Sequence, residues 1–150
     1  MDIKIIAKNR KANFEYFIEE SFEAGIALTG SEIKSVRAGQ VSLQEAYIQI
    51  DGQQAFLVNC HIAPYQFGSY SDHDPKRPRK LLLHKKEIRR LWAEVRQRGV
   101  TIIPVKMYLK NGKAKLEIAI AKGKKLYDKR ESIAKKDQQR DVARQLRDRD

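Results

Sequence analysis

The N-terminal part of the chain alternates apolar and polar positions in short runs, which is typical of β-strands. Such alternation covers residues 14–18, and a second apolar run covers residues 25–28. We expect two strands here, joined through a Glu-rich turn. A short helix should follow, because Ser31 is a good N-cap residue and Gly39 can supply a left-handed end.

Two β-hairpins are predicted further along the chain. In each, two apolar runs flank a dipeptide that tolerates the positive φ values of a tight turn, Asp51-Gly52 in the first and Asn111-Gly112 in the second. The four runs are residues 46–50 and 55–62, and residues 101–109 and 114–120. Pro104 predicts an edge position or a bulge in the second hairpin, because proline cannot donate a ladder hydrogen bond.

A helix is predicted between the hairpins, after a proline-containing loop over residues 63–80. Apolar residues recur at helical spacing through residues 85–98, and Gly99 ends the pattern. The chain is therefore expected to be mainly β with two to three helices. About six short strands predict a small, partly closed barrel of the oligonucleotide-binding type, plugged by the longer helix. An open α+β sandwich is the alternative.

Charge is distributed unevenly along the 150 residues, whose formal net charge is +12. Residues 1–75 carry six Lys or Arg and ten Asp or Glu, whereas residues 76–150 carry 25 and nine. Clustered cations bind polyanions through counterion release, which points to nucleic acid or an anionic membrane. No apolar run approaches the ~20 residues that span a bilayer, so nucleic acid is favoured over a membrane. The N-terminus resembles neither a signal peptide nor an anchor, and we expect a cytoplasmic protein.

The last thirty residues are expected to form a basic tail (121–150) separate from the barrel domain (1–120). They carry 11 Lys or Arg, six Asp or Glu and few large apolar side chains, too little to offset the entropy of ordering. The tail should be disordered when free and helical when bound. A helix over residues 132–149 would place four cations within a wedge of roughly 80°, namely Lys136, Arg140, Arg144 and Arg147. A permanently disordered tail is the alternative.

Two other segments are candidates for RNA contact. Residues 75–84 (PKRPRKLLLH) place four cations on a proline-stiffened loop, which lowers the entropy lost on meeting phosphates. Residues 9–11 lie beside aromatic positions, Phe14, Tyr16 and Phe17, whose rings can stack on bases. A solvated loop and core aromatics are the alternative interpretations of these two segments.

Catalytic chemistry finds no support in the sequence. Cys60 and His61 are adjacent, so on a strand their side chains point to opposite faces and do not form a dyad. The three histidines lack metal-ligand spacing, and no glycine-rich phosphate loop or nucleophile elbow is present. We expect no enzyme activity, no metal and no cofactor. Cys60 itself is predicted to be a buried thiol in a reducing compartment.

Four motifs in register resemble the SsrA-binding protein family, also called small protein B (SmpB). They are residues 9–12 (NRKA), 23–39 (EAGIALTGSEIKSVRAG), 79–84 (RKLLLH) and 122–130 (KGKKLYDKR). The resemblance implies an oligonucleotide-binding barrel that binds the tRNA-like domain of transfer-messenger RNA (SsrA RNA) and delivers it to stalled ribosomes. It implies an adaptor of trans-translation rather than an enzyme.

The resemblance also implies which residues contact RNA. Five family positions should face the RNA, and six cations or neighbours in the same motifs should accompany them. The whole set is Asn9, Arg10, Lys11, Tyr16, Glu23, Lys34, Arg37, Arg79, Lys80, Leu82 and Lys115. Glu23 would accept hydrogen bonds from base amino groups or 2′-hydroxyls, or orient a cation.

In the family the tail enters the decoding centre and the mRNA channel of the small ribosomal subunit and becomes helical there. The tail residues expected to bind the ribosome are Lys124, Lys125, Tyr127, Asp128, Lys129, Arg130, Lys136, Arg140 and Arg144. Tyr127 stands where some members have His. Alanyl-tRNA synthetase and elongation factor Tu are expected to act on the same RNA. A general single-strand RNA chaperone on the same barrel is the alternative function, and a metal-dependent ribonuclease is a competing one.

Overall fold

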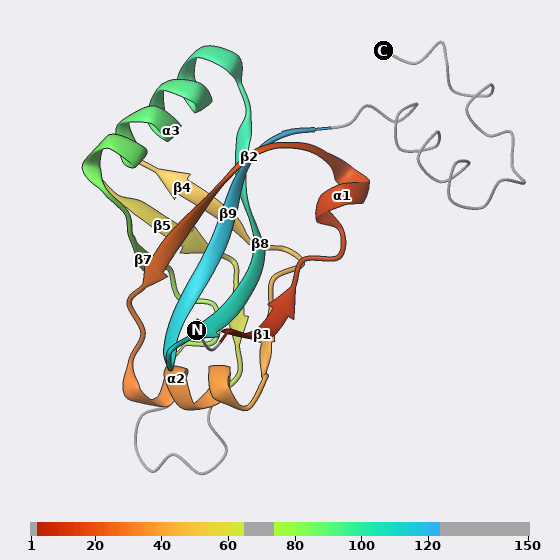
Figure 1. Cartoon of the computed structure of the whole chain (residues 1–150), viewed down its shortest axis with the longest axis vertical. Coiled ribbons are helices and arrows are strands. Elements are labelled where there is room, and N and C mark those ends of the chain that lie inside the picture. Colours follow the sequence, from red (N-terminus) through yellow and green to blue (C-terminus); the bar gives the residue numbers. More distant parts are fainter. Residues whose placement is uncertain (1–2, 65–73, 124–150) are drawn as a thin grey trace, which may run out of the picture.

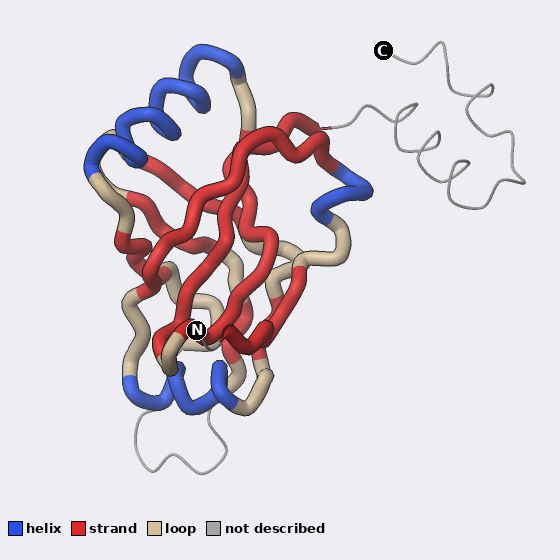
Figure 2. The backbone as a smooth tube through the Cα atoms, in the orientation of Figure 1, coloured by secondary structure: helices blue, strands red, loops and turns tan. Residues whose placement is uncertain are grey.

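The computed structural model describes residues 3–64 and 74–123 (Figures 1 and 2). Strands dominate this part of the chain, and three helices accompany them. In chain order the elements are β1 (Ile3–Lys8), α1 (Ala12–Glu15), β2 (Tyr16–Ile26), α2 (Gly30–Arg37), β3 (Val41–Ser42), β4 (Tyr47–Ile50), β5 (Ala55–Val58), β6 (His61–Ile62), β7 (Arg79–Leu82), α3 (Lys85–Arg98), β8 (Thr101–Lys110) and β9 (Lys113–Gly123).

Six strands close into a ring. Their order is β8-β4-β5-β7-β2-β9, and β9 pairs back onto β8. All of these pairs are antiparallel. The β1 strand joins β8 outside the ring, and β3 and β6 form a separate two-stranded sheet. The predicted small barrel is therefore confirmed, and the alternative of an open sandwich is wrong.

The interior of the ring is filled by aliphatic side chains from all sides. Leu57, Leu81 and Leu116 from three different strands are at most 1% exposed. The two longer helices add Val36 and Leu91 to the same cluster. Figure 1 shows α3 and α2 at opposite ends of the ring. The longer helix therefore closes one end of the barrel, as the apolar stripe in residues 85–98 predicted.

The prediction for residues 14–28 is wrong in detail. Residues 12–15 form α1, and one continuous 11-residue strand, β2, replaces the two expected strands. The Glu-rich segment is not a turn, because Glu19 and Glu20 lie on β2 and form ion pairs with Arg98 and Arg90 of α3. Glu19 and Glu20, which the local pattern assigned to a turn, are therefore paired with arginines that are distant in the sequence.

The α2 helix forms where a short helix was expected, but Thr29 rather than Ser31 is its N-cap. The Thr29 side chain accepts from the Glu32 N–H, and the Glu32 side chain accepts from the Thr29 N–H at 2.9 Å, a reciprocal capping box. Gly39, just beyond the helix, has φ +78° as predicted. The predicted helix is confirmed, but its N-cap lies two residues earlier in the chain than predicted.

Both hairpins are confirmed as β4–β5 and β8–β9. The first turn holds four residues rather than two, since Ile50 pairs with Ala55. The β5 strand ends at Val58, and the next residue, Asn59, has φ +63°. In the second hairpin the register shifts between Pro104 and Lys106, which confirms the predicted bulge.

Three strands lie outside the predicted elements. The β1 strand occupies the N-terminus, and the two-residue β3 follows α2. The β7 strand occupies the end of the segment expected to be a loop and inserts between β5 and β2. The β9 strand also continues to Gly123, three residues beyond the predicted end of the barrel domain. The α3 helix, in contrast, has the predicted bounds, and Gly99 ends it in the left-handed conformation with φ +66°.

Candidate nucleic-acid interface

A groove of about 500 Å³ opens between β2, β7, β9, the β4–β5 turn and the start of α3. It unites four of the residues predicted to contact RNA, Glu23, Lys80, Leu82 and Lys115. We call it the central groove. Its full lining is Glu23, Gly25, Gln53, Gln54, Lys80, Leu81, Leu82, Leu83, His84, Lys85, Glu87, Ile88 and Lys115.

Strand register explains why these side chains meet. Gly25 of β2 lies opposite Leu82 on one side and opposite Lys115 on the other. A β-carbon built at Gly25 would lie 3.2 Å from the Leu82 β-carbon, so glycine leaves room for the leucine. Leu82 is 56% exposed, although large apolar side chains usually pack inside. An exposed leucine between lysines offers an apolar surface for a base.

Glu23 is held as a carboxylate at the edge of this groove. The Tyr108 hydroxyl donates a hydrogen bond to Glu23 Oε2, and Lys110 Nζ lies 3.4 Å from the same oxygen. The hydrogen bond from Tyr108 lowers the pKa of Glu23 below its ordinary value, against a smaller opposing effect of burial. Because Glu23 itself remains exposed, its second oxygen can accept from an amino group or hydroxyl of a ligand.

Three other predicted residues surround a second pocket of about 300 Å³, lined in part by Asn9, Lys11 and Tyr16. Asn9 is 91% buried and has a structural role. Its amide Nδ2 donates a hydrogen bond to the Pro104 carbonyl at 2.9 Å. Asn9 Oδ1 is buried without a hydrogen-bond partner. Lys11 Nζ lies 3.5 Å from Glu45 at the surface. Asn9 thus joins the end of β1 to the bulge in β8.

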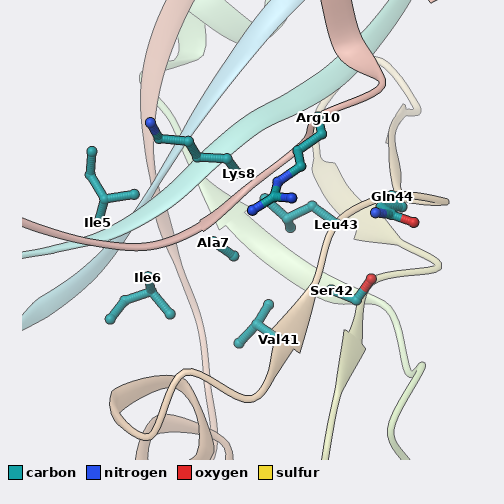
Figure 3. Close-up of a pocket in the computed structure, with 9 residues that line it drawn as sticks. All are labelled: Ile5, Ile6, Ala7, Lys8, Arg10, Val41, Ser42, Leu43 and Gln44. Carbon is teal, nitrogen blue, oxygen red and sulfur yellow. The ribbon is translucent and has the colours of Figure 1, made fainter.

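Arg10 lines a third pocket, of about 420 Å³, between β1 and residues 41–44 (Figure 3). Lys8 is on the same pocket, together with apolar side chains of β1. Lys34 and Arg37 are exposed on α2, outside all three of these pockets. The predicted set is therefore divided among several surfaces, and the central groove holds its largest group.

Arg79 does not face solvent, and the prediction that it contacts RNA is wrong. Its side chain is fully buried and forms a salt bridge of 2.8 Å with the buried Glu32. Arg79 Nη1 also donates to the Cys60 carbonyl at 2.6 Å. Because side chains alternate along β7, Arg79 shares the inner face with Leu81, while Lys80 and Leu82 point outward. Treating the segment as a loop concealed this alternation.

Several groove or groove-supporting residues were missed from the sequence. Gln53 and Gln54 come from the β4–β5 turn, and Lys85 is the first residue of α3. Tyr108 lies opposite Lys115 in the β8–β9 ladder. The turn dipeptide next to the two glutamines was a usable signal, because tight turns project their residues from the barrel surface. The nine predicted tail residues, from Lys124 to Arg144, lie outside the described residues.

Within residues 3–64 and 74–123, no group of three or more His, Cys, Asp or Glu side chains is arranged to hold a metal ion. No helix in that part of the chain has the length and apolar character needed to cross a membrane. Cys60 is fully buried, as predicted, and burial raises its pKa to about 12.

Comparison with known proteins decides the family. The family model described as SmpB protein matches residues 6–148, nearly the whole chain. The chain belongs to the SmpB family. Among its relatives, the SsrA-binding protein of Roseiflexus sp. (strain RS-1) is 54% identical over 147 residues, covering 97% of this chain and 93% of that protein. The SsrA-binding protein of Chloroflexus aggregans is 56% identical over 146 residues, covering 97% and 92%.

A solved structure supports the same family. This SmpB-family chain is similar to a chain in the structure described as "tmRNA-SmpB: a journey to the center of the bacterial ribosome", with a TM-score of 0.68 and 47% sequence identity. The match covers 85% of this chain and 93% of the other. The resemblance inferred from the four sequence motifs is therefore confirmed at the level of family and fold.

Proposed function

We propose that this SmpB-family chain is an RNA-binding adaptor of trans-translation that holds the tRNA-like domain of transfer-messenger RNA in its central groove. The observation that supports this most directly is the meeting of Glu23, Lys80, Leu82 and Lys115 in one groove from three strands. The relatives named SsrA-binding protein support the choice of RNA.

Each of these four side chains has a chemical task in the proposal. Lys80 and Lys115 line the groove together with Leu82 and attract phosphates. Leu82 supplies an apolar surface on which a base rests. Glu23, kept ionised by Tyr108 and Lys110, accepts from a base amino group or a 2′-hydroxyl and so discriminates among ligands by hydrogen bonding. No bond of the RNA is broken, so the chain acts as a binder and not as an enzyme.

The tail has a separate task in the proposal. Residues 124–150 enter the empty decoding centre and mRNA channel of the small subunit of a stalled ribosome, where their cations meet RNA walls. Alanyl-tRNA synthetase and elongation factor Tu act on the same RNA molecule without being required for the groove contact. The barrel is then the RNA anchor, and the tail is the part that probes the ribosome.

The test compares three full-length or truncated proteins for binding to transfer-messenger RNA, binding to an unrelated structured RNA, and tagging of a stalled nascent chain. The variants are Lys80→Gln with Lys115→Gln, a 1–130 truncation, and a control with Lys4→Gln and Lys8→Gln that removes the same charge elsewhere. We expect the groove variant to lose selective RNA binding, the truncation to lose tagging alone, and the control to behave as wild type.

Other outcomes would reject specific parts of the proposal. Equal affinity of the wild-type protein for both RNAs would favour the general single-strand RNA chaperone. Chelator-sensitive cleavage of the RNA would favour the ribonuclease. Loss of selective binding on truncation would place the RNA anchor in the tail.

A further inference from the structure

The α3 helix carries two sets of cations that differ in their partners. Arg90 and Arg98 face β2, where Arg90 pairs with Glu20 and Arg98 Nη1 lies 2.8 Å from Glu19 Oε1. These pairs attach the helix to the barrel. Lys85, Arg89 and Arg96 are exposed and form no ion pair with any carboxylate in the described part of the chain. Their charge remains available to a partner.

Three of these available cations lie on one face of the helix, and Lys86, which is also exposed and forms no ion pair with a described carboxylate, lies to one side of them. At 3.6 residues per turn, Lys85, Arg89, Trp92 and Arg96 fall within a wedge of about 60° and extend over about 16 Å of helix axis. We call this row the α3 stripe. Trp92 is half-buried, and the Arg96 guanidinium lies 5.3 Å from the centre of its ring. A guanidinium held against an aromatic face loses less entropy when it binds an anion.

The β4–β5 turn supports the stripe and joins it to the central groove. Gly52 lies against Trp92, since a β-carbon built at Gly52 would be 3.5 Å from indole Cε2. The next two residues of the turn, Gln53 and Gln54, line the groove, and so does Lys85, the first member of the stripe. The stripe is therefore a direct continuation of the groove surface rather than an isolated patch.

We propose that the α3 stripe binds the phosphate backbone of the same RNA molecule that occupies the central groove. The proposal rests on the proposed function, because it extends the RNA contact of that groove along α3. Three exposed cations in a row match the regular negative charge of an RNA strand. Because the stripe continues the groove surface, the RNA in the groove is the expected partner rather than a ribosomal segment. Phosphate contacts of this kind add affinity and fix orientation without reading sequence.

The test uses full-length protein and a transcript of the tRNA-like domain, with affinity measured across salt concentrations. The stripe variant combines Lys85→Gln, Arg89→Gln and Arg96→Gln. We expect its affinity to fall about tenfold or more at low salt, and the slope of log K against log salt to become shallower by about 2, since each phosphate contact contributes about 0.7–0.9. A charge-retaining variant, Lys85→Arg with Arg89→Lys and Arg96→Lys, should keep most of the wild-type slope.

A matched control removes three other lysines, Lys4, Lys8 and Lys106, and should change the slope by much less. Circular dichroism of every variant checks that α3 is intact. If the stripe variant and the control lose equal amounts, or if the stripe variant binds the transcript as wild type does, the stripe proposal is wrong. If RNA binding is unchanged but tagging on ribosomes falls, the stripe contacts the ribosome and the proposal is also wrong. Failure of the wild-type protein to prefer this transcript would instead reject the proposed function.

Discussion

The Glu32 carboxylate and the Arg79 guanidinium form a salt bridge of 2.8 Å in which both side chains are fully buried. Arg77 donates to the same carboxylate, with its Nε 2.8 Å from Glu32 Oε2, and Arg79 also reaches the Cys60 carbonyl. One carboxylate thus joins α2 to β7 and to the segment that precedes β7. The carboxylate also accepts from the Thr29 N–H, so it receives hydrogen bonds from three residues.

Replacing Glu32 by Gln should destabilise the fold strongly. The change leaves the buried Arg79 charge without a counterion, and breaking a buried pair in this way typically costs about 3–5 kcal/mol. Urea unfolding measures the free energy of unfolding. Glu45→Gln is the control, because Glu45 is an exposed partner of Lys11 and its loss should cost less than about 1 kcal/mol. Equal costs for the two variants would contradict this account.

Stability should also fall in acid because of Glu32. Burial alone would raise the pKa of this carboxyl, but hydrogen bonds from Arg77, the Thr29 N–H and Arg79 outweigh it and lower the pKa from 4.5 to about 2. The unfolded chain therefore binds the proton more readily, so the stabilisation from Glu32 is present above about pH 4.5 and is lost as the pH falls toward about 2. Unfolding curves from pH 6 to pH 2 test this, and Glu32→Gln should lose less stability over the same range.

Removing the Tyr108 hydroxyl should weaken RNA binding because it changes the hydrogen bonding and the pKa of Glu23. In Tyr108→Phe the hydrogen bond that lowers the pKa of Glu23 is absent, so that pKa should rise, which carboxyl NMR can follow. We expect RNA affinity to fall about threefold to tenfold, with a stability loss of about 1 kcal/mol. Lys106→Gln, on the same strand as Tyr108, removes the partner of Glu117 of β9 and is the control. An unchanged Glu23 titration would contradict the proposed coupling.

Cys60 should be inert toward thiol reagents in the folded protein. Its side chain is fully buried, and burial raises its pKa to about 12, so almost no thiolate is present at pH 8. Labelling with a chromogenic disulfide reagent should be slow in buffer and complete in denaturant. Rapid labelling of native protein would show that the segment around Cys60 opens readily.

Gly99 should matter for its backbone conformation and not for RNA. Because its φ is +66° at the end of α3, Gly99→Ala should cost about 1 kcal/mol, and Gly99→Asn should cost less since Asn tolerates the left-handed region. Thermal unfolding ranks the three proteins. RNA affinity of the folded variants should match wild type, and a selective loss of binding would mean that this corner touches the ligand.

Local patterns predicted the elements whose stabilising chemistry is local. The α3 helix carries its own apolar stripe and its own glycine end, and the β8–β9 hairpin carries its own turn dipeptide. The Glu-rich part of β2 was missed because Glu19 and Glu20 meet arginines about 70 to 80 residues away. Arg79 was misplaced for the same reason, since its partner Glu32 is 47 residues distant. The residues of the central groove were reached through family resemblance, because Leu82, Lys115 and Glu23 come together only when the ring closes.

The pairing of β9 gives the barrel a mechanical property. This strand hydrogen-bonds to β2 on one side and to β8 on the other, and its last residue, Gly123, leads directly into residue 124. Antiparallel hydrogen bonds run perpendicular to the strands, so a tension applied at Gly123 along β9 loads both ladders in shear and must strain many bonds together. Lys115 of the groove lies on that same strand. A pull on the C-terminal segment is therefore borne by a strand that is hydrogen-bonded on both edges, and the force reaches the central groove without breaking the ladders one pair at a time.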